Sequence, residues 1–314
     1  MRKVISACSL NSEGEILAKS SKPRKRKIAR SRFRKLSEEE LLFRNKAKQY
    51  YQVLNLTMDL SQNQHCIDTD GRGVRAIKIF TRQTLSAMSL SSILPKLSLD
   101  KDPDTELWDV SSIASITRNI LEAYLAIFYS GIENISNEEA ELRFFIGQLH
   151  RNREWYLVHK SQNSDIETLN EFKTGMKEQE ERIKNHSYLS NLTNAQKNKA
   201  LKGDEMYYTK ADFEKKARIC SELRAEYQLL SNFVHPLPLS IERIDNDRGR
   251  GTSNVYDISY SLGCITIATK YLAASTLGIL DHFPEQLGKF FNNKAKPIRE
   301  LLSTDEYNQV AGGL

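Results

Sequence analysis

The residues best placed for chemistry are a tyrosine, a serine and a histidine at four-residue intervals, Tyr227, Ser231 and His235. This spacing places the phenol, the hydroxyl and the imidazole on one face of a predicted helix. Pro236 disfavours helical backbone at His235, so the helix should end there, where the helix dipole favours a cationic imidazole. The pattern therefore indicates a proton donor or an anion-binding group at a helix end.

Two further segments carry charged residues inside apolar sequence. Arg118 and Glu122 are one helical turn apart in the apolar stretch 108–129, and a buried charge needs a partner, so they should pair. Arg143 opens the next predicted helix. One interpretation is a structural buried network, in which the charges neutralise each other and the Tyr and His side chains cap backbone groups. The alternative is a pocket in which arginine binds phosphate and His235 or Glu122 moves a proton.

The basic charge of the chain is concentrated at its N-terminus. The chain has 46 Lys and Arg against 40 Asp and Glu, a net charge of +6. Residues 1–35 hold 12 of the basic and 2 of the acidic residues, a net of +10, so the remaining 34 basic and 38 acidic residues give −4. Polar sequence without periodicity predicts a disordered arm over 1–35.

Phosphate contacts made by such an arm would be sensitive to salt and independent of base sequence, so nucleic acid is the expected partner. The alternatives are a solvated arm that aids solubility and a segment that binds anionic lipid, for which it lacks an apolar face. The residues predicted to bind nucleic acid are Lys22, Arg24, Lys25, Arg26, Lys27, Arg30, Arg32, Arg34 and Lys35.

Composition favours a helical, globular, cytoplasmic protein. The 14 Gly and 7 Pro among 314 residues are too few for a turn-rich β sandwich or barrel. The 4 Cys are far apart and have no zinc-ligand spacing, so we expect a reducing compartment, no metal site and no cofactor. The first eight residues superficially resemble a lipoprotein cleavage site but lack the apolar stretch of an export signal, so export is not expected.

Apolar periodicity predicts a multi-helix bundle over residues 36–303, followed by a frayed tail at 304–314. The apolar segment 258–280 contains only Lys270 as a charge and has no basic flanks, so it should be a core helix rather than a membrane span. The glycines of the loop 245–254 are a weak phosphate-loop signal, since no strand precedes them. Capping boxes are expected at 37–40, 136–139 and 164–167, and a mobile connection with a short helix is expected at 185–206. Longer helices are expected at 74–94, 108–129, 136–160, 164–183, 209–236, 255–282 and 285–303.

The combination of Arg118 and Glu122 on one helix, Arg143 on the next and Tyr227-x3-Ser231-x3-His235-Pro on a late helix resembles an uncharacterised family of bacterial all-helical proteins often found near mobile elements. The resemblance covers roughly residues 40–285. That family is reminiscent of HEPN domains, helical bundles that include metal-independent ribonucleases of toxin and anti-phage systems. The resemblance implies a HEPN-like bundle, an intracellular defence-type role and no bound metal.

HEPN ribonucleases carry an arginine and a polar residue, followed a few residues later by a histidine. Two places match this pattern loosely. One is Arg143 with His150, where Phe144 stands in place of the polar residue, and the other is Arg153 with His159. The second pair would point to different sides of an ideal helix, so it could share a site only across a helix irregularity or a dimer interface.

These observations predict a bacterial defence or toxin-type effector that engages nucleic acid, with metal-independent RNA cleavage as its candidate activity. An arginine would bind the scissile phosphate, the glutamate would orient it, the histidine would act as general acid and base, and the phenol and hydroxyl would fix the substrate. The alternatives are a non-enzymatic interaction subunit with a protein partner encoded nearby, and a nucleotide-sensing module. A homodimer is compatible with each, and no membrane association is expected. The candidate catalytic residues are Arg118, Glu122, Arg143, Tyr227, Ser231 and His235.

Overall fold

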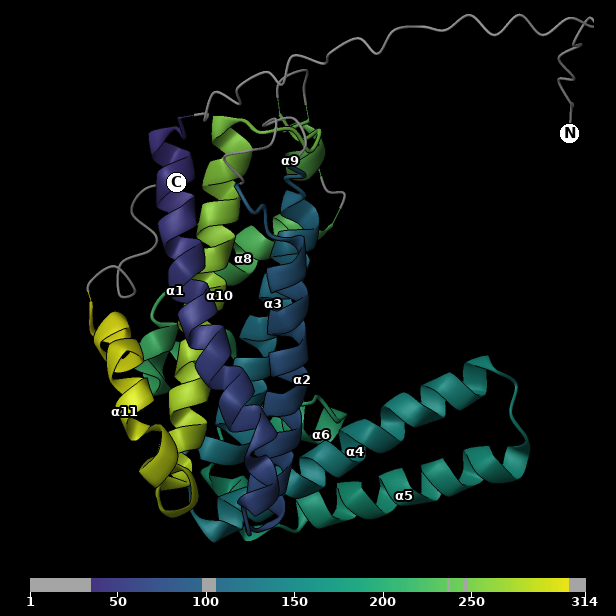
Figure 1. Ribbon diagram of the computed structural model, residues 1–314. Coiled ribbons are helices and arrows are strands. Elements are labelled where there is room, and N and C mark those ends of the chain that lie inside the picture. The colour runs from purple at the N-terminus through teal and green to yellow at the C-terminus, as the bar shows by residue number, and fades with distance from the viewer. Residues whose placement is uncertain (1–34, 98–105, 236–237, 245–247, 305–314) are drawn as a thin grey trace, which may run out of the picture.

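The computed structural model describes residues 35–97, 106–235, 238–244 and 248–304. Every regular element within these ranges is helical, so the predicted all-α class is confirmed (Figure 1). Apart from Lys35, the basic arm lies outside the described residues, as does the tail beyond residue 304. The disorder expected of both segments therefore stays a prediction.

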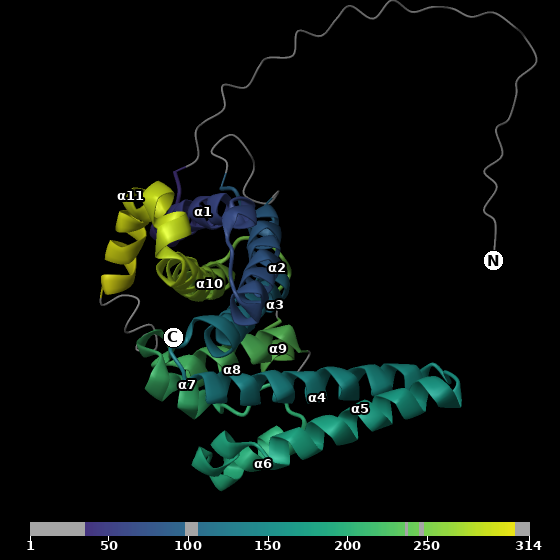
Figure 2. The same ribbon diagram turned by 90° about the horizontal axis from the view of Figure 1, so that it is seen from below.

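Four long helices form a closed ring around the core. α1 (Glu38–Gln62) packs against α10 (Val255–His282), and α10 packs against α3 (Val110–Ile127). α3 packs against α2 (Gly71–Ile93), which returns to α1 (Figures 1 and 2). Each helix turns apolar side chains towards this shared interior, which is the arrangement of a helical bundle.

Shorter elements cover the outside of this ring. α11 (Pro284–Ser303) packs against α10 and α1, close to its predicted bounds. α8 (Leu223–Val234) packs against α3, and the short α9 (Pro238–Ile241) follows it. α8 is the element that brings Tyr227 beside α3.

The apolar segment at 255–282 is a core helix, as predicted. α10 is the helix of the described chain that is long and apolar enough to cross a membrane, but 78% of its most apolar window is buried within the bundle. Its Lys270 is fully buried, and the ammonium donates to Glu226 Oε1 of α8 at 2.7 Å. Tyr271 donates to the other oxygen of the same carboxylate. The charge of Lys270 is thus paired inside the protein, as a buried charge must be.

The helix-start signals are only partly correct. The capping box at Ser37 forms, with Glu40 N donating to Ser37 Oγ at 3.2 Å and Ser37 N donating to Glu40 Oε2 at 2.9 Å. α2 begins earlier than predicted, because Asp70 accepts a backbone N–H at 2.8 Å and caps the helix. α5 is capped by Asp165 rather than Ser164. A carboxylate is an equally good cap, and the chain uses it here.

A long helical hairpin projects from the bundle. α3 runs on through a π-helical turn, Phe128–Ile132, into a connection that leads to α4 (Asn137–Ser161). α4 packs antiparallel against α5 (Ile166–Lys184), and the pair extends well beyond the ring (Figures 1 and 2). Among the described residues, the part of α4 nearer the bundle contacts the rest of the chain as far as Arg153, so that junction needs strong contacts.

The connection at 185–206 contains the predicted short helix, but the rest of it is folded rather than mobile. It contains a 3-10 turn, Ser187–Asn191, and α6 (Asn194–Lys202). The reason is burial, since Leu192 and Ala200 are covered by the protein. Apolar residues spaced among Asn and Lys therefore anchor this stretch at the base of the hairpin.

The prediction of one long helix at 209–236 is wrong, because the helix is interrupted at Ala217. Ala217 has extended backbone with φ −120° and ψ 109°. Glu214 then accepts from the backbone N of Arg224 at 3.0 Å and from its Nε at 2.8 Å, which supports the start of a new helix. Apolar side chains on both sides of the break remain buried, so the periodicity correctly predicted burial but not continuity. The resulting elements are α7 (Lys210–Lys216), a 3-10 turn (Arg218–Cys220) and α8.

Candidate functional site

Four of the six candidate catalytic residues meet where α8 packs against α3, and we call them the Arg118 cluster: Arg118, Glu122, Tyr227 and His235. Arg118 Nε donates to Glu122 Oε1 at 2.9 Å, and Arg118 Nη2 donates to the hydroxyl of Tyr227. The Tyr227 hydroxyl donates to Glu122 Oε1 at 2.9 Å. These three bonds close a triangle between two helices, so the guanidinium is held in one orientation.

The Arg118–Glu122 pair forms as predicted, but it is not buried. The two side chains are 22% and 43% exposed, because α8 covers only part of this side of α3. Partial burial lowers the pKa of Arg118, but Glu122 and Tyr227 outweigh it and hold that pKa above its ordinary value. Burial, followed by the bond to Glu122, raises the pKa of Tyr227. The cluster therefore presents a permanent cation that solvent and ligands can reach.

His235 stands beside this cation at the end of α8. Its backbone is extended with ψ 144°, as expected before a proline, and its side chain is exposed. His235 Nε2 lies 3.5 Å from Arg118 Nη1. Guanidinium nitrogens donate and never accept, so the imidazole nitrogen is the acceptor in this contact. A nitrogen lone pair beside a fixed cation is the arrangement needed to remove a proton from a group bound to that cation.

Ser231 shares the helix face but does not join the cluster. Its hydroxyl donates to the backbone carbonyl of Tyr227 at 2.8 Å, within the same helix. This local bond is a common alternative for a serine inside a helix. The expectation that Ser231 fixes the substrate has no support in the geometry.

The variant Ser231→Ala is therefore expected to retain ligand affinity within about twofold of the wild type, which corresponds to less than about 0.5 kcal/mol. Tyr227→Phe should behave differently, since it removes the hydroxyl that contacts both Arg118 and Glu122. Isothermal titration of the two variants with a short oligonucleotide would measure this. A loss of affinity in Ser231→Ala as large as that in Tyr227→Phe would contradict the assignment.

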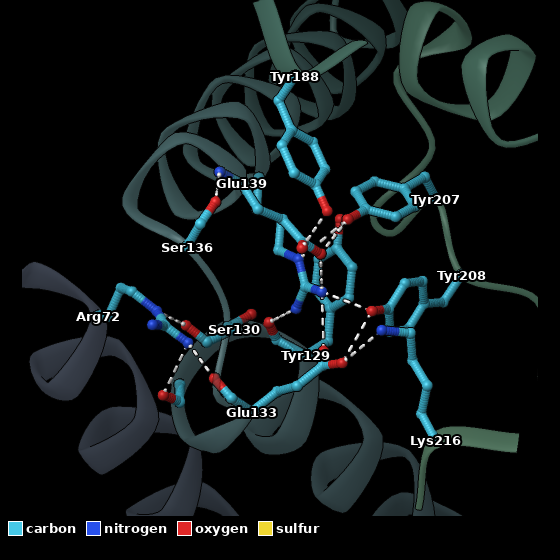
Figure 3. A network of polar contacts seen from close by, with 12 residues as sticks. Arg72, Tyr129, Ser130, Glu133, Ser136, Glu139, Tyr188, Tyr207, Tyr208 and Lys216 are labelled. Carbon is cyan, nitrogen blue, oxygen red and sulfur yellow. Dashed lines mark hydrogen bonds and ion pairs between the residues drawn. The ribbon is translucent and has the colours of Figure 1, made fainter. Parts of the chain in front are cut away.

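Arg143 lies in a separate, buried network at the start of α4. Figure 3 labels its partners Glu133, Glu139, Tyr207 and Tyr208. Its guanidinium contacts two carboxylates, with Nη2 at 2.8 Å from Glu133 Oε2 and also bonded to Glu139. It further donates to Tyr208 Oη at 2.7 Å and to Tyr207 Oη at 3.3 Å. These partners come from the connection after the π-helical turn, from α4 and from the segment after α6, so the network joins the hairpin to the bundle.

The prediction that Arg143 could bind the same phosphate as Arg118 is therefore corrected. Arg143 is 3% exposed, and its guanidinium is occupied by carboxylates, phenols and the Tyr129 carbonyl. Burial by itself would lower the pKa of Arg143, but the neighbouring phenols and Glu133 raise it above its ordinary value. A cation that is this enclosed and this well paired has a structural role.

Two cavities are lined by members of the Arg118 cluster. The first, of about 450 Å³, has His235 in its wall, and we call it the His235 cavity. The second, of about 710 Å³, has Glu122 and Tyr227 in its wall together with Tyr208 of the Arg143 network. Basic side chains are found in both walls. They are Arg243, Arg248 and Arg250 in the first cavity and Arg82, Lys199 and Lys210 in the second.

Sequence reasoning named none of these cations as site residues, and two of them lie over aromatic rings. Lys210 Nζ lies 3.7 Å from the centre of the Tyr227 ring, because the break at Ala217 allows α7 to return along α8. Arg243 lies over the ring of Tyr260 at 4.3 Å. Lys210 has no periodic relation to the cluster, and α8 ends before the four-residue spacing reaches Arg243, so no local signal could have found them.

The loop with the weak phosphate-loop signal does reach the His235 cavity. Gly249 and Gly251 line it and have φ values of 71° and 84°, which glycine adopts without strain. The two HEPN-like pairs do not form sites in the same way. His150 Nδ1 contacts the carbonyl of Gly203 at 3.0 Å, and His159 stacks on Phe172 with ring centres 5.2 Å apart. These histidines therefore contribute to local packing.

Comparison with known proteins does not test the resemblance to the HEPN-like bacterial family, which stays a prediction. No family model matches the chain, and searches of curated proteins and of solved structures likewise find no match. Among the described residues, no group of three or more His, Cys, Asp or Glu side chains is arranged to hold a metal ion. The function is therefore argued from the Arg118 cluster itself.

Proposed function

We propose that this chain binds nucleic acid and that the Arg118 cluster holds one phosphodiester group. The observation that carries the proposal is a partly exposed guanidinium, fixed by Glu122 and Tyr227, with the exposed imidazole of His235 at 3.5 Å. Arginine offers paired donors that match phosphate oxygens. The cations around both cavities add to the attraction, and the N-terminal basic arm is proposed to increase affinity without base specificity.

The reaction that this geometry supports best is metal-independent cleavage of RNA. His235 removes the proton from a ribose 2′-hydroxyl, and the resulting 2′-oxygen attacks the adjacent phosphorus. The bond from phosphorus to the 5′-oxygen breaks, and that oxygen leaves with a proton returned by the protonated imidazole. Arg118 stabilises the charge that develops on the phosphate oxygens, and Glu122 and Tyr227 keep the guanidinium in place. The products are a 2′,3′-cyclic phosphate and a 5′-hydroxyl.

The proposed setting is a cytoplasmic bacterial effector of the defence or toxin type with a HEPN-like bundle. Its support is the resemblance carried by Arg118, Glu122, Tyr227, Ser231 and His235. The bundle arrangement and the position of the cluster on its surface are compatible with this setting.

Binding to a short 2′-O-methyl oligonucleotide tests the phosphate site apart from cleavage. Arg118→Ala should weaken binding by about 10- to 100-fold, since a charge-assisted hydrogen bond contributes about 1.5–3 kcal/mol. Arg44→Ala is the matched control, because Arg44 is exposed on α1, away from α8. Fluorescence anisotropy of the full chain gives both dissociation constants. Equal affinities of the two variants would show that the Arg118 cluster is not part of the binding surface.

A further inference from the structure

Two residues in the wall of the His235 cavity carry a buried hydrogen-bond donor that no group in the described part of the chain satisfies. Trp108 lies in its wall and is 1% exposed, yet its indole nitrogen has no partner. Arg243 Nη1, in the same wall, is also buried without a partner. Buried donors are nearly always paired, and leaving one unpaired is unfavourable. Two such donors in one cavity wall indicate a ligand that carries acceptor atoms.

The charge around the cavity indicates that this ligand is an anion. Arginines supply three positive charges to the wall, and two carboxylates oppose them. Both carboxylates already accept bonds within the protein. Asp257 accepts from Gly249 N at 2.9 Å and from Asn254 Nδ2 at 2.7 Å, and Asp109 caps α3. The first residues of α3 also line the cavity, so the positive end of its dipole adds to the field.

The remaining wall is flat and aromatic. The guanidinium of Arg243 lies 4.3 Å from the centre of the Tyr260 ring and 5.3 Å from that of Phe233. Guanidinium and aromatic planes are the surfaces on which unpaired bases stack. A volume of about 450 Å³ is in the range of small-molecule sites. An anion with a flat apolar part matches this wall, and a nucleotide has both features.

We infer that the His235 cavity is a subsite for the nucleotide adjacent to the phosphate held by Arg118. The phosphate of that nucleotide accepts from Arg243 and Trp108, and its base lies against the arginine and aromatic planes. His235 connects the two positions, since it lines the cavity and also contacts Arg118. This inference rests on the proposed function and extends it, because it makes the ligand a strand of at least two phosphates that crosses the cluster.

Tryptophan emission can report occupancy of this cavity alone. The chain has 2 Trp, and Trp155 is 51% exposed on the projecting hairpin, so Trp155→Phe leaves Trp108 as the only indole. This full-length variant is titrated with a 2′-O-methyl trinucleotide, which has two phosphodiesters, and separately with a mononucleotide. We expect a saturable change in Trp108 emission with the trinucleotide and at least tenfold weaker binding of the mononucleotide.

Substitutions at Arg243 complete the test. In the same background, Arg243→Leu should weaken trinucleotide binding by about 10- to 100-fold, as expected for a lost charge-assisted hydrogen bond. Arg243→Lys should restore part of the lost affinity. Arg44→Leu should have no effect, since Arg44 lies outside both cavities. Thermal melting of each variant confirms that it is folded, and the Arg243→Lys comparison holds even if the leucine variant is unstable.

The outcomes separate this inference from the proposed function. In one outcome, trinucleotide binding needs Arg118 but does not change Trp108 emission and is not weakened by Arg243→Leu. That result would overturn the subsite and leave the phosphate site intact. Equal affinity for mononucleotide and trinucleotide, with no effect of Arg118→Ala, would mean an independent nucleotide site and would also overturn the inference. Trinucleotide binding that neither Arg118→Ala nor Arg243→Leu weakens would contradict the proposed function itself.

Discussion

Replacing Arg143 by methionine is expected to lower the free energy of unfolding by about 3–5 kcal/mol, because it leaves buried carboxylates without their cation. The side chains of Arg143, Glu133 and Glu139 are only 3%, 9% and 8% exposed. Arg118→Ala should cost about 1 kcal/mol or less, since its ion pair with Glu122 is partly solvated. Urea denaturation measures both changes in the free energy of unfolding, provided that the slope of this free energy against urea concentration is the same in each variant.

Lys184→Met provides the control for a generic loss of an ion pair. Lys184 contacts Glu181 at 2.9 Å, but the two side chains are 49% and 64% exposed. Its removal should change stability by less than about 1 kcal/mol. If Arg143→Met were no more destabilising than this control, the Arg143 network would not be what holds the hairpin to the bundle.

The variant His235→Ala is expected to slow RNA cleavage by about 10²- to 10⁴-fold, the usual contribution of a general acid–base group. Its melting temperature should barely change, because the imidazole is exposed and the polar contact that it makes is a long one, to Arg118 at 3.5 Å. Single-turnover cleavage of a labelled RNA gives the rate, and circular dichroism gives the melting temperature.

His159→Ala is the matched control, since His159 belongs to the second HEPN-like pair in the sequence. In the structure it bonds to Ser164 at 3.0 Å and stacks on Phe172. Cleavage by this variant should match the wild type. Loss of cleavage in His159→Ala with retention in His235→Ala would move the active site from the Arg118 cluster to the hairpin.

Local signals predicted much of the fold. The capping box at Ser37 and the unbroken apolar run at 255–282 each depend on residues close in sequence. α1 begins at the predicted box, and α10 has the predicted bounds. The break at Ala217 could not be predicted in this way, because it depends on a bond from Glu214 to Arg224 that forms only once the chain has turned. Helical spacing persists across the break, so the pattern shows which side chains are buried but not how the backbone places them.

The candidate site shows the same division. Tyr227 and His235 share a helix face, and Arg118 and Glu122 share a turn of another, so their meeting needs only that α3 and α8 pack together. Arg143 looked equivalent in sequence, yet the tyrosines and carboxylates that enclose it come from three separate segments. Burial therefore distinguishes the two arginines, and burial is a tertiary property that spacing along the chain does not reveal.

The ends of the cleavage products test whether the Arg118 cluster cleaves RNA without a metal ion. The full chain is incubated in EDTA with an RNA oligonucleotide and with a DNA oligonucleotide of the same sequence, and the product ends are identified by mass spectrometry. We predict that the wild type cleaves only the RNA and leaves 2′,3′-cyclic phosphate ends, and that Arg118→Ala abolishes this cleavage. Cleavage of both strands alike, undiminished activity in Arg118→Ala, or no cleavage of any RNA by the wild type would contradict the account.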